Sequence, residues 1–454
     1  MARVITQETF DEVVKENMEE FDMTEEEAVE EAKKQFEAQG VNLSNIVMAC
    51  SSAIIVTQCV SNIRKEITSS DEHNDVTISN ELTILKAELD KEIAVRVLAA
   101  KEGLYQLLID CLNKMEPQYL IQVLETLTSL TNGYPDLLDK SGQDFMIAFL
   151  HTTTNVDLII QNIKWMKNCV AKHEKNRADL IDLGVQDRFR NILSKFKDEP
   201  KLVVQVCQLV RRLVSDDDIR VAHGNPHEHA RALAKETLCL FVSLLDKYQS
   251  NAIVLNDILQ VICALIVRDE FCIKVYNQNG LRFIMDAMIA FLDDEKINRQ
   301  CLLLLKGLAG NDQIKEAIIA EGFAPQIIFA MSKHKSSANL ISAGCVCISA
   351  LALRSPNNSQ ALIEAGAAEL LVSVLNIYKD NHVILNNACM AIRNQLSRYP
   401  NAKDEYLQLG LEELLNELQT KGKLEYETKA VLRELGCDVK LEEPWKGEGR
   451  QLAQ

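Results

Sequence analysis

Apolar residues between Ser359 and Leu396 recur at spacings of three and four residues, in three consecutive stretches. This spacing places apolar side chains on one face of an α-helix, so the segment predicts three amphipathic helices in one unit. The first predicted helix ends at Gly366, because glycine readily adopts the left-handed conformation that closes a helix. The apolar positions are Leu370, Leu371, Val374 and Leu375 in the second helix and Val383, Ile384, Leu385, Ala388, Met390, Ala391 and Ile392 in the third.

The same glycine-punctuated unit recurs along the chain, each time with a short amphipathic segment before the glycine and an apolar helix after it. Successive glycines are 39, 42, 40, 56, 42, 44 and 44 residues apart, so all but one of the intervals lie near 42. The interval of 56 indicates an insertion of about a dozen residues after Gly224. The eight glycines are Gly103, Gly142, Gly184, Gly224, Gly280, Gly322, Gly366 and Gly410.

A helical repeat of this period predicts an all-α, right-handed superhelical solenoid of about eight three-helix units. Each unit can bury its apolar faces only by stacking on its neighbours. We expect this solenoid over residues 81–437, with the insertion near 225–238. An apolar helix and a polar connector should precede it over 41–80, and a flexible tail should follow over 438–454.

Residues 1–40 predict two helices, and Thr24 and Glu27 have the spacing of a capping box at the start of the second. This segment holds thirteen acidic and four basic residues. It has two interpretations: an acidic cap packed on the first repeat, or a helix pair that docks onto a partner.

Polar side chains recur at positions i, i+3 and i+7 on the third helix of most predicted units, a spacing that keeps them on one helical face. In a curved stack these faces would form a concave groove. The register also includes Tyr119, Thr126 and Asp257. The candidate groove residues are Gln122, Gln161, Lys164, Asn168, Gln205, Gln208, Arg212, Gln260, Arg299, Lys306, Asn387 and Asn394.

Such a groove predicts binding of an extended peptide from another protein. The amide side chains could bond to its backbone, and the Arg and Lys side chains could meet its acidic groups. In the fifth and sixth units Ala343, Val346 and Ala350 fill the equivalent places, so the groove there would favour hydrophobic side chains. The alternative is that these faces are polar because water covers them.

The net charge of −17 opposes binding to nucleic acids or anionic membranes, because it provides no overall basic surface. The apolar run 46–60 is interrupted by polar residues and is too short to cross a bilayer. Seven of the thirteen cysteines lie in apolar helical runs, which predicts buried thiols and a reducing compartment. We therefore expect a cytoplasmic protein, with the nucleus as a second location. The seven are Cys169, Cys207, Cys239, Cys263, Cys301, Cys345 and Cys389.

His223, His227 and His229 at the start of the insertion suggest a metal-dependent function as one alternative. If Pro226 begins a helix, however, His227 and His229 lie two residues apart on opposite sides of its first turn, a poor geometry for one metal ion. The other interpretation is an ordered start to an elongated helix, with Arg231 and Lys235 exposed. We expect no metal and no cofactor.

No enzyme signature occurs in the sequence: a phosphate-binding glycine loop, a nucleophile elbow and a zinc-protease motif are all missing. The acids Asp216, Asp217 and Asp218 could be mistaken for a metal site. They predict instead the cap and first-turn acids of a short helix that contains Ile219 and Val221. We expect a non-enzymatic protein.

The three-helix unit with a glycine between its first and second helices resembles the armadillo repeat, over about residues 81–435. Three further segments together resemble the armadillo repeat-containing protein 6 family: ITQETFDEVVKENMEEF at 5–21, QFEAQGVNLSNIV at 35–47 and SDDDIRVAHGNPHEHAR at 215–231. The resemblance implies an intracellular, non-enzymatic scaffold or adaptor, and it does not name the partner.

Armadillo proteins of the nuclear-import type carry a Trp four residues before an Asn on the third helix. Here Lys164 and Met390 stand four residues before Asn168 and Asn394, and Trp165 is one position off. Import-type binding of basic peptides is therefore a second alternative that the resemblance does not support.

Overall fold

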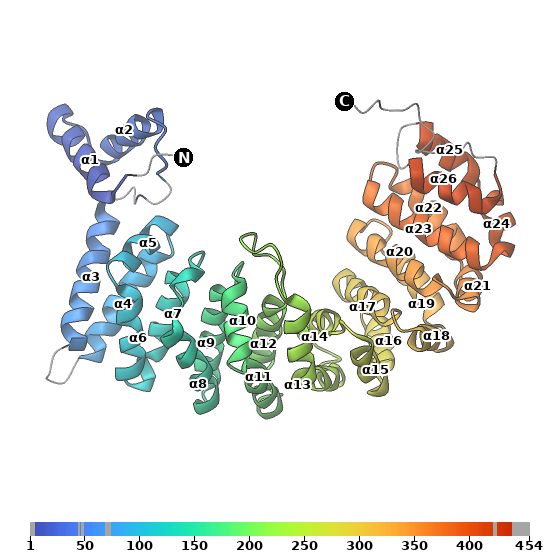
Figure 1. The fold of residues 1–454 in the computed structure, drawn as a ribbon, viewed down its shortest axis with the longest axis horizontal. Coiled ribbons are helices and arrows are strands. Elements are labelled where there is room, and N and C mark those ends of the chain that lie inside the picture. The colour runs from blue at the N-terminus through green and yellow to red at the C-terminus, as the bar shows by residue number, and fades with distance from the viewer. Residues whose placement is uncertain (1–4, 44–45, 47–49, 69–73, 421–424, 438–454) are drawn as a thin grey trace, which may run out of the picture. The chain divides into compact units, whose positions relative to one another are not determined.

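The computed structural model describes residues 5–43, 46, 50–68, 74–420 and 425–437 (Figure 1). Their regular elements are twenty-six α-helices and three short 3-10 helices, so the predicted all-α repeat fold is confirmed. The chain divides into two units, residues 1–236 and 237–454. The predicted tail 438–454 and residues 69–73 of the predicted connector lie outside the described residues.

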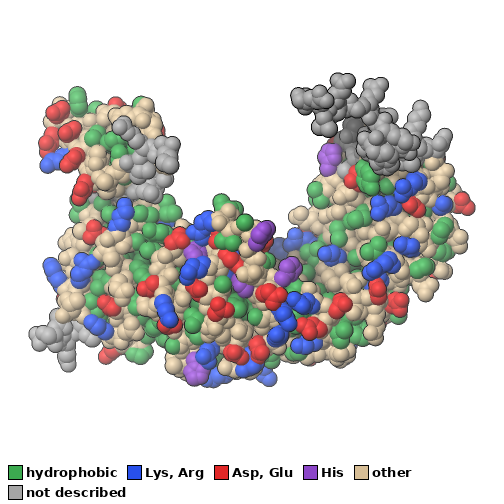
Figure 2. Space-filling view, in the orientation of Figure 1, with side chains coloured by type: hydrophobic (Ala, Val, Ile, Leu, Met, Phe, Trp, Pro, Cys, Tyr) green, Lys and Arg blue, Asp and Glu red, His purple; other side chains and the backbone are tan. Residues whose placement is uncertain are grey.

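The first unit begins with a helical hairpin, α1 (Gln7–Phe21) and α2 (Glu25–Ala38). The Thr24 side chain accepts a hydrogen bond from the Glu27 backbone and the Glu27 carboxylate accepts one from the Thr24 N–H, which confirms the capping box. The hairpin has its own apolar core, in which the Phe10 and Phe36 rings lie 5.9 Å apart. Figure 2 shows several acidic side chains on its surface.

The rest of the first unit is a stack of helices. It starts with the pair α3 and α4, which packs on α5 and α6. Helix α3 lies within the range 41–80, as the apolar helix predicted there does. Helix α4 begins at Asp75, so residues 75–80 are helical and not part of a connector. The helices are α3 (Cys50–Thr68), α4 (Asp75–Leu89), α5 (Ile93–Lys101), α6 (Leu104–Lys114), α7 (Leu120–Leu130), α8 (Lys140–Thr152), α9 (Val156–Cys169), α10 (Glu174–Asp182), α11 (Val185–Lys195) and α12 (Pro200–Leu213).

Helix α13 (Pro226–Lys247) is 22 residues long, twice the length of α11, which confirms the predicted elongated helix and its start at Pro226. The second unit contains α14 (Ala252–Leu265), α15 (Asp269–Asn277), α16 (Gly280–Ala290), α17 (Glu295–Leu308), α18 (Asp312–Ala320), α19 (Phe323–Lys333), α20 (Ala338–Ala352), α21 (Pro356–Glu364), α22 (Ala367–Ile377), α23 (His382–Arg398), α24 (Lys403–Gln408), α25 (Leu411–Thr420) and α26 (Glu425–Leu435). The 3-10 helices are η1 (Pro117–Tyr119), η2 (Pro135–Leu137) and η3 (Pro400–Ala402).

The third helices of successive repeats lie side by side and carry the main contacts of each unit. In the first unit α4, α7, α9 and α12 pack in this order, and in the second α14, α17, α20, α23 and α26 do (Figure 1). Each interior third helix therefore buries two sides, as Leu340, Cys345, Ile348 and Leu351 of α20 illustrate. This leaves one narrow face of each third helix open.

Five of the eight predicted glycines close a first helix in the left-handed conformation, with φ between 73° and 93°: Gly103, Gly184, Gly322, Gly366 and Gly410. Gly142 instead lies in the first turn of α8, where an added Cβ would clash with the Tyr105 hydroxyl. Gly224 lies in the segment before α13. At Gly280 the preceding Asn279 takes the left-handed position (φ 60°), which asparagine tolerates.

The cysteine prediction is confirmed for five of the seven thiols, but Cys239 is exposed and Cys263 is partly buried. Cys239 lies on the solvent side of the elongated α13, where its apolar neighbours alone did not reveal the helix orientation. Burial raises the pKa of the Cys345 and Cys389 thiols to about 12. No single described helix is long and apolar enough to span a membrane. Among the described helices, only the bent pair α21 and α22, taken together, has the required length and composition.

The left-handed glycine at Gly366 provides a test of the repeat geometry. We expect Gly366→Ala to lower the free energy of unfolding by about 1–2 kcal/mol, because an added Cβ makes the left-handed conformation unfavourable. Space does not add to this cost, since the nearest atom, of Ile328, would be 4.0 Å away. Urea unfolding followed by circular dichroism measures the effect. As a control, Asn279→Gly at the equivalent turn should be neutral or stabilising, and equal losses in both variants would contradict the assignment.

Candidate functional site

The open faces of the third helices are the candidate functional site. We call those of α4, α7, α9 and α12 the unit-1 face, and those of α14, α17, α20, α23 and α26 the unit-2 face. Eleven of the twelve predicted groove residues are partly or fully exposed on these faces. Asn394 is buried, and the register neighbours Thr126 and Asp257 are also buried.

Side chains on the unit-1 face link one third helix to the next. Lys167 Nζ of α9 donates hydrogen bonds to Gln205 Oε1 at 2.6 Å and to Gln208 Oε1 at 2.7 Å on α12. Gln161 Nε2 donates to Glu125 Oε1 of α7 at 3.3 Å. Three predicted amides are therefore engaged within the stack. The sequence missed Lys167, because it lies outside the i, i+3, i+7 register.

The predicted asparagines bond to the third helix that precedes them. Asn168 Nδ2 donates to the Thr128 carbonyl oxygen at 2.8 Å. Asn394 Nδ2 donates to the Ser349 carbonyl oxygen at 3.1 Å and to its Oγ at 2.9 Å. These two amides hold neighbouring repeats together. Asn387 follows the same pattern, since its Nδ2 donates to Ser342 Oγ at 3.0 Å.

A cleft of about 410 Å³ lies between α4 and α7 at the start of the unit-1 face. Gln122 contributes to it, and its Oε1 is buried with no hydrogen-bond partner in the described structure. Thr126 turns its hydroxyl back to the Gln122 carbonyl oxygen at 2.8 Å. The lining residues are Leu82, Thr83, Lys86, Ala87, Asp90, Gln122, Glu125 and Thr126.

The unit-2 face changes character along the stack. Gln260 of α14 and Arg299 of α17 are partly exposed, and Lys306 is exposed. The next helix, α20, presents Val346 and Ala350, both partly buried. This part of the face is apolar at Val346 and Ala350, as the sequence predicts, whereas Ala343 is buried.

Trp165 does not reach the unit-1 face. It is fully buried, and its ring centroid lies 6.5 Å from that of Phe145 on α8. The tryptophan therefore belongs to the core between the second and third helices, so it provides no aromatic surface for a peptide.

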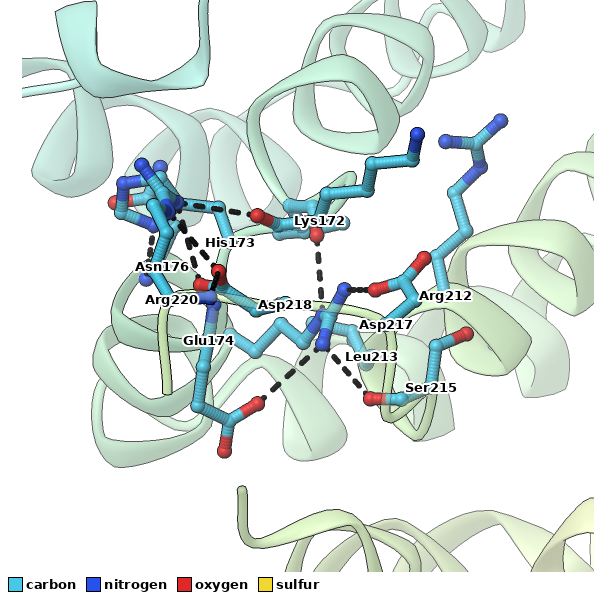
Figure 3. A network of polar contacts seen from close by, with 12 residues as sticks. Lys172, His173, Glu174, Asn176, Arg212, Leu213, Ser215, Asp217, Asp218 and Arg220 are labelled. Carbon is cyan, nitrogen blue, oxygen red and sulfur yellow. Dashed lines mark hydrogen bonds and ion pairs between the residues drawn. The ribbon is translucent and has the colours of Figure 1, made fainter. Parts of the chain in front are cut away.

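A second cluster surrounds the buried Arg177 of α10, whose side chain is 1% exposed. Its Nε donates to the Val170 carbonyl oxygen at 3.0 Å and its Nη1 to the Ser215 carbonyl oxygen at 2.7 Å. Its guanidinium group also pairs with the Glu174 and Asp217 carboxylates. Arg177 thus fixes the segment that follows α12. In Figure 3 the Arg212 side chain points away from this cluster.

The short helix predicted at Ile219 and Val221 is wrong, because residues 215–225 contain no helix. The acids that suggested it bind other partners. Asp218 Oδ2 accepts a hydrogen bond from the Glu174 backbone N–H at 2.8 Å, at the start of α10. Its Oδ1 accepts one from Arg220 Nε at 2.9 Å. The segment takes the place of a first helix in the fourth repeat.

Arg220 sets the charge state of Asp218. Its hydrogen bond, aided by the Glu174 backbone N–H, holds the pKa of the Asp218 carboxyl well below the usual range despite partial burial. Arg220 Nη1 also pairs with Asp136 Oδ1 at 3.0 Å, and this contact connects the segment to the second repeat. The cluster is therefore a structural clamp formed by charged groups.

The three histidines of the insertion do not gather at one point. His229 is 5% exposed, with its Nδ1 3.2 Å from the Leu213 carbonyl oxygen and its Nε2 3.8 Å from Glu174 Oε1. His223 and His227 are exposed. Within the described part of the chain, no three His, Cys, Asp or Glu side chains are arranged to hold a metal ion. Lys235 is exposed as expected, and Arg231 is partly buried.

The N-terminal hairpin leaves a cleft of about 850 Å³ between itself and the stack. Thr6, Gln7 and Asp11 on the hairpin side face Ile54 of α3, which is 65% exposed. Both interpretations of residues 1–40, as a cap or as a docking element, stay predictions.

Comparisons with known proteins connect the sequence and the fold. The ARMC6 family model matches residues 56–454, and the model of the armadillo repeat-containing protein 6 N-terminal domain matches residues 2–75. The armadillo repeat-containing protein 6 homolog of Drosophila melanogaster is 37% identical, over 79% of this chain and 79% of its own length. The human armadillo repeat-containing protein 6 is 32% identical, over 79% and 76%.

Two solved structures share the fold. An engineered protein matches with a TM-score of 0.71 at 14% identity, over 96% of this chain and 100% of that one. A structure from a study of the phosphorylation-controlled interaction between cadherin and β-catenin matches with a TM-score of 0.59 at 16% identity, over 82% and 69%. At these identities the similarity concerns the fold alone.

The bonds of Asn394 predict a stability effect. We expect Asn394→Ala to lower the free energy of unfolding by about 1–2 kcal/mol, because it leaves the buried Ser349 carbonyl and hydroxyl without their donor. Asn386→Ala on the same helix is the matched control, since Asn386 is partly exposed. Thermal melts of both variants measure the difference, and equal melting temperatures would contradict the structural role of Asn394.

The depressed pKa of Asp218 predicts a pH dependence. Its contribution to stability is complete above the unfolded pKa of about 4 and is lost as the pH falls toward the folded pKa. We therefore expect Asp218→Asn to destabilise the protein near neutral pH, and the gap to wild type to shrink below about pH 4. Melting temperatures across this range test it, with Asp216→Asn, at an exposed acid, as the control. A gap that stays constant down to about pH 2.5 would exclude the clamp as its origin.

Proposed function

The chain belongs to the armadillo repeat-containing protein 6 family, and from this premise we propose that it is a non-enzymatic scaffold that binds a segment of another protein along its third-helix faces. Extended binding surfaces of this kind are a general property of stacked helical repeats. The third helices support the proposal, because they pack side by side and carry partly exposed residues on the side that the packing leaves open.

The observation that carries the proposal is the state of the basic side chains on these faces. Lys164, Arg299 and Lys306 are accessible, and none forms an ion pair with an acid of the described chain. The chain has 66 acidic and 49 basic residues, so acids were available to neutralise a face that only contacts water. Accessible bases without such partners are suited to an acidic group on another molecule.

Two alternatives receive less support. An import-type carrier of basic peptides would place its ligand against bases of the same charge, and Trp165 is buried rather than presented. A metal-dependent function at His223, His227 and His229 would need these side chains to converge, and His229 instead bonds within the clamp. We also propose the cytoplasm as the compartment, because the buried cysteines suit reducing conditions.

A charge reversal on the unit-1 face tests the proposal. We expect Lys164→Glu with Arg212→Glu to weaken partner binding by about tenfold, or about 1.4 kcal/mol, by replacing attraction with repulsion. The measurement is quantitative affinity purification of the tagged full chain from cell extract, followed by the affinity of each recovered partner for purified protein.

Lys140→Glu with Lys235→Glu is the matched control, because it makes the same charge change at exposed positions on second helices. The control should keep the partners of wild type. All three proteins should share one melting temperature within a few degrees. If partners bind the Lys164→Glu, Arg212→Glu variant as tightly as wild type, the assignment of the unit-1 face as a binding surface is wrong.

A further inference from the structure

Three consecutive third helices of the second unit have a charge opposite to that of the whole chain. Helices α17, α20 and α23 together contain one acidic residue, Glu295, whereas the chain carries a net charge of −17. The Glu295 carboxylate already accepts a hydrogen bond from the Ser337 hydroxyl. The basic residues of these helices are Lys296, Arg299, Lys306, Arg393 and Arg398.

None of these five bases forms an ion pair with any part of the chain that the structure describes. Arg299 and Lys306 lie seven residues apart on α17, so they share its open face. Arg393 of α23 is partly exposed on the other side of α20. The unit-2 face therefore has positive charge on both sides of its middle helix.

Between these charges the face is apolar. Helix α20 contains no charged residue, and it presents Val346 and Ala350. Leu303 of α17 is partly exposed, and Met390 of α23 is 37% exposed. A ligand that lies across the three helices thus meets a basic edge, an apolar floor and a second basic edge.

We propose that the unit-2 face binds an extended protein segment that has a short apolar stretch with one carboxylate on each side of it. This rests on the proposed scaffold function and names the class of its partner. Packed helices lie about 8–10 Å apart, so α17 and α23 are separated by about 16–20 Å. An extended chain advances about 3.3 Å per residue, which places the two carboxylates about five or six residues apart.

The charge pattern distinguishes the unit-2 face from the start of the unit-1 face. There the cleft between α4 and α7 contains Asp90 and Glu125 with one base, Lys86, which already pairs with Asp90 at 3.4 Å. The apolar floor also favours a peptide over a nucleic acid as the ligand, because Val346, Ala350 and Met390 provide no aromatic ring on which a base could stack. Binding of single-stranded RNA at this face is therefore an outcome that would count against the proposal.

The experiment is selection from a library of displayed random peptides about twelve residues long, roughly twice the proposed span. The full chain is the target, and wild type is compared with Arg299→Glu combined with Lys306→Glu. We expect wild type to enrich peptides with the acid, apolar, acid pattern at the stated spacing. The variant should bind those peptides at least about tenfold more weakly, measured by fluorescence anisotropy.

A charge exchange gives a sharper arm of the same test. Replacing the carboxylate that meets α17 with lysine should weaken the selected peptide on wild type and restore part of its affinity for the Glu variant. Lys335→Glu with Lys403→Glu makes the same charge change away from the third helices and should bind as wild type does. Circular dichroism establishes that every variant is folded.

The outcomes separate this inference from the scaffold proposal. Selected peptides without acidic residues, or none above background, would overturn the acid and apolar specificity. Displacement of a selected peptide by a single-stranded RNA oligonucleotide at similar concentration would overturn it as well. Peptides that lack the pattern but lose affinity in the third-helix variants would leave the scaffold proposal standing. If the selected peptides bind every third-helix variant of both units as tightly as wild type, both the specificity inference and the scaffold proposal are contradicted.

Discussion

Every other feature of each unit depends on the packing of third helices against one another. An interior third helix lies between two others, so it must be apolar on two sides, and each fully buried Leu or Ile contributes about 1.5–3 kcal/mol to the stack. Helix α20 shows the limit of this constraint, with no charged residue in its sequence. Only a narrow face of each third helix stays open. Its few residues must both bond to neighbouring helices and contact any ligand.

The two tasks are divided among those residues in a consistent way. Amides such as Asn168 and Asn394 satisfy backbone carbonyls of the preceding helix, where an unpaired carbonyl would be costly. The longer bases Arg299 and Lys306 extend beyond the stack and keep their charge accessible. In the fourth repeat a non-helical segment takes the place of the first helix. Arg177 holds this segment in position with side-chain hydrogen bonds, whereas helix packing holds the first helices of other repeats.

The repeat architecture could be predicted because it depends on short-range signals: helical periodicity, and glycine at the turn between first and second helices. The signal failed where another residue fulfilled the same condition, as Asn279 does in place of Gly280. It also failed where glycine served a different purpose, as Gly142 does beneath Tyr105. A register based on spacing alone found the open face but could not reveal which amides turn to a neighbouring helix, because that depends on contacts between residues some 40 positions apart.

That separation has a consequence for biosynthesis. The hydrogen bonds of Asn168 and Asn394 join residues 40 and 45 positions apart, and the main contacts between the described third helices join neighbours in the same way. A nascent chain needs only one further repeat to complete each layer, which at about 5–20 residues per second takes a few seconds. Layers can thus be added in order at the ribosome, so that little apolar surface stays exposed until a distant part of the chain is synthesised.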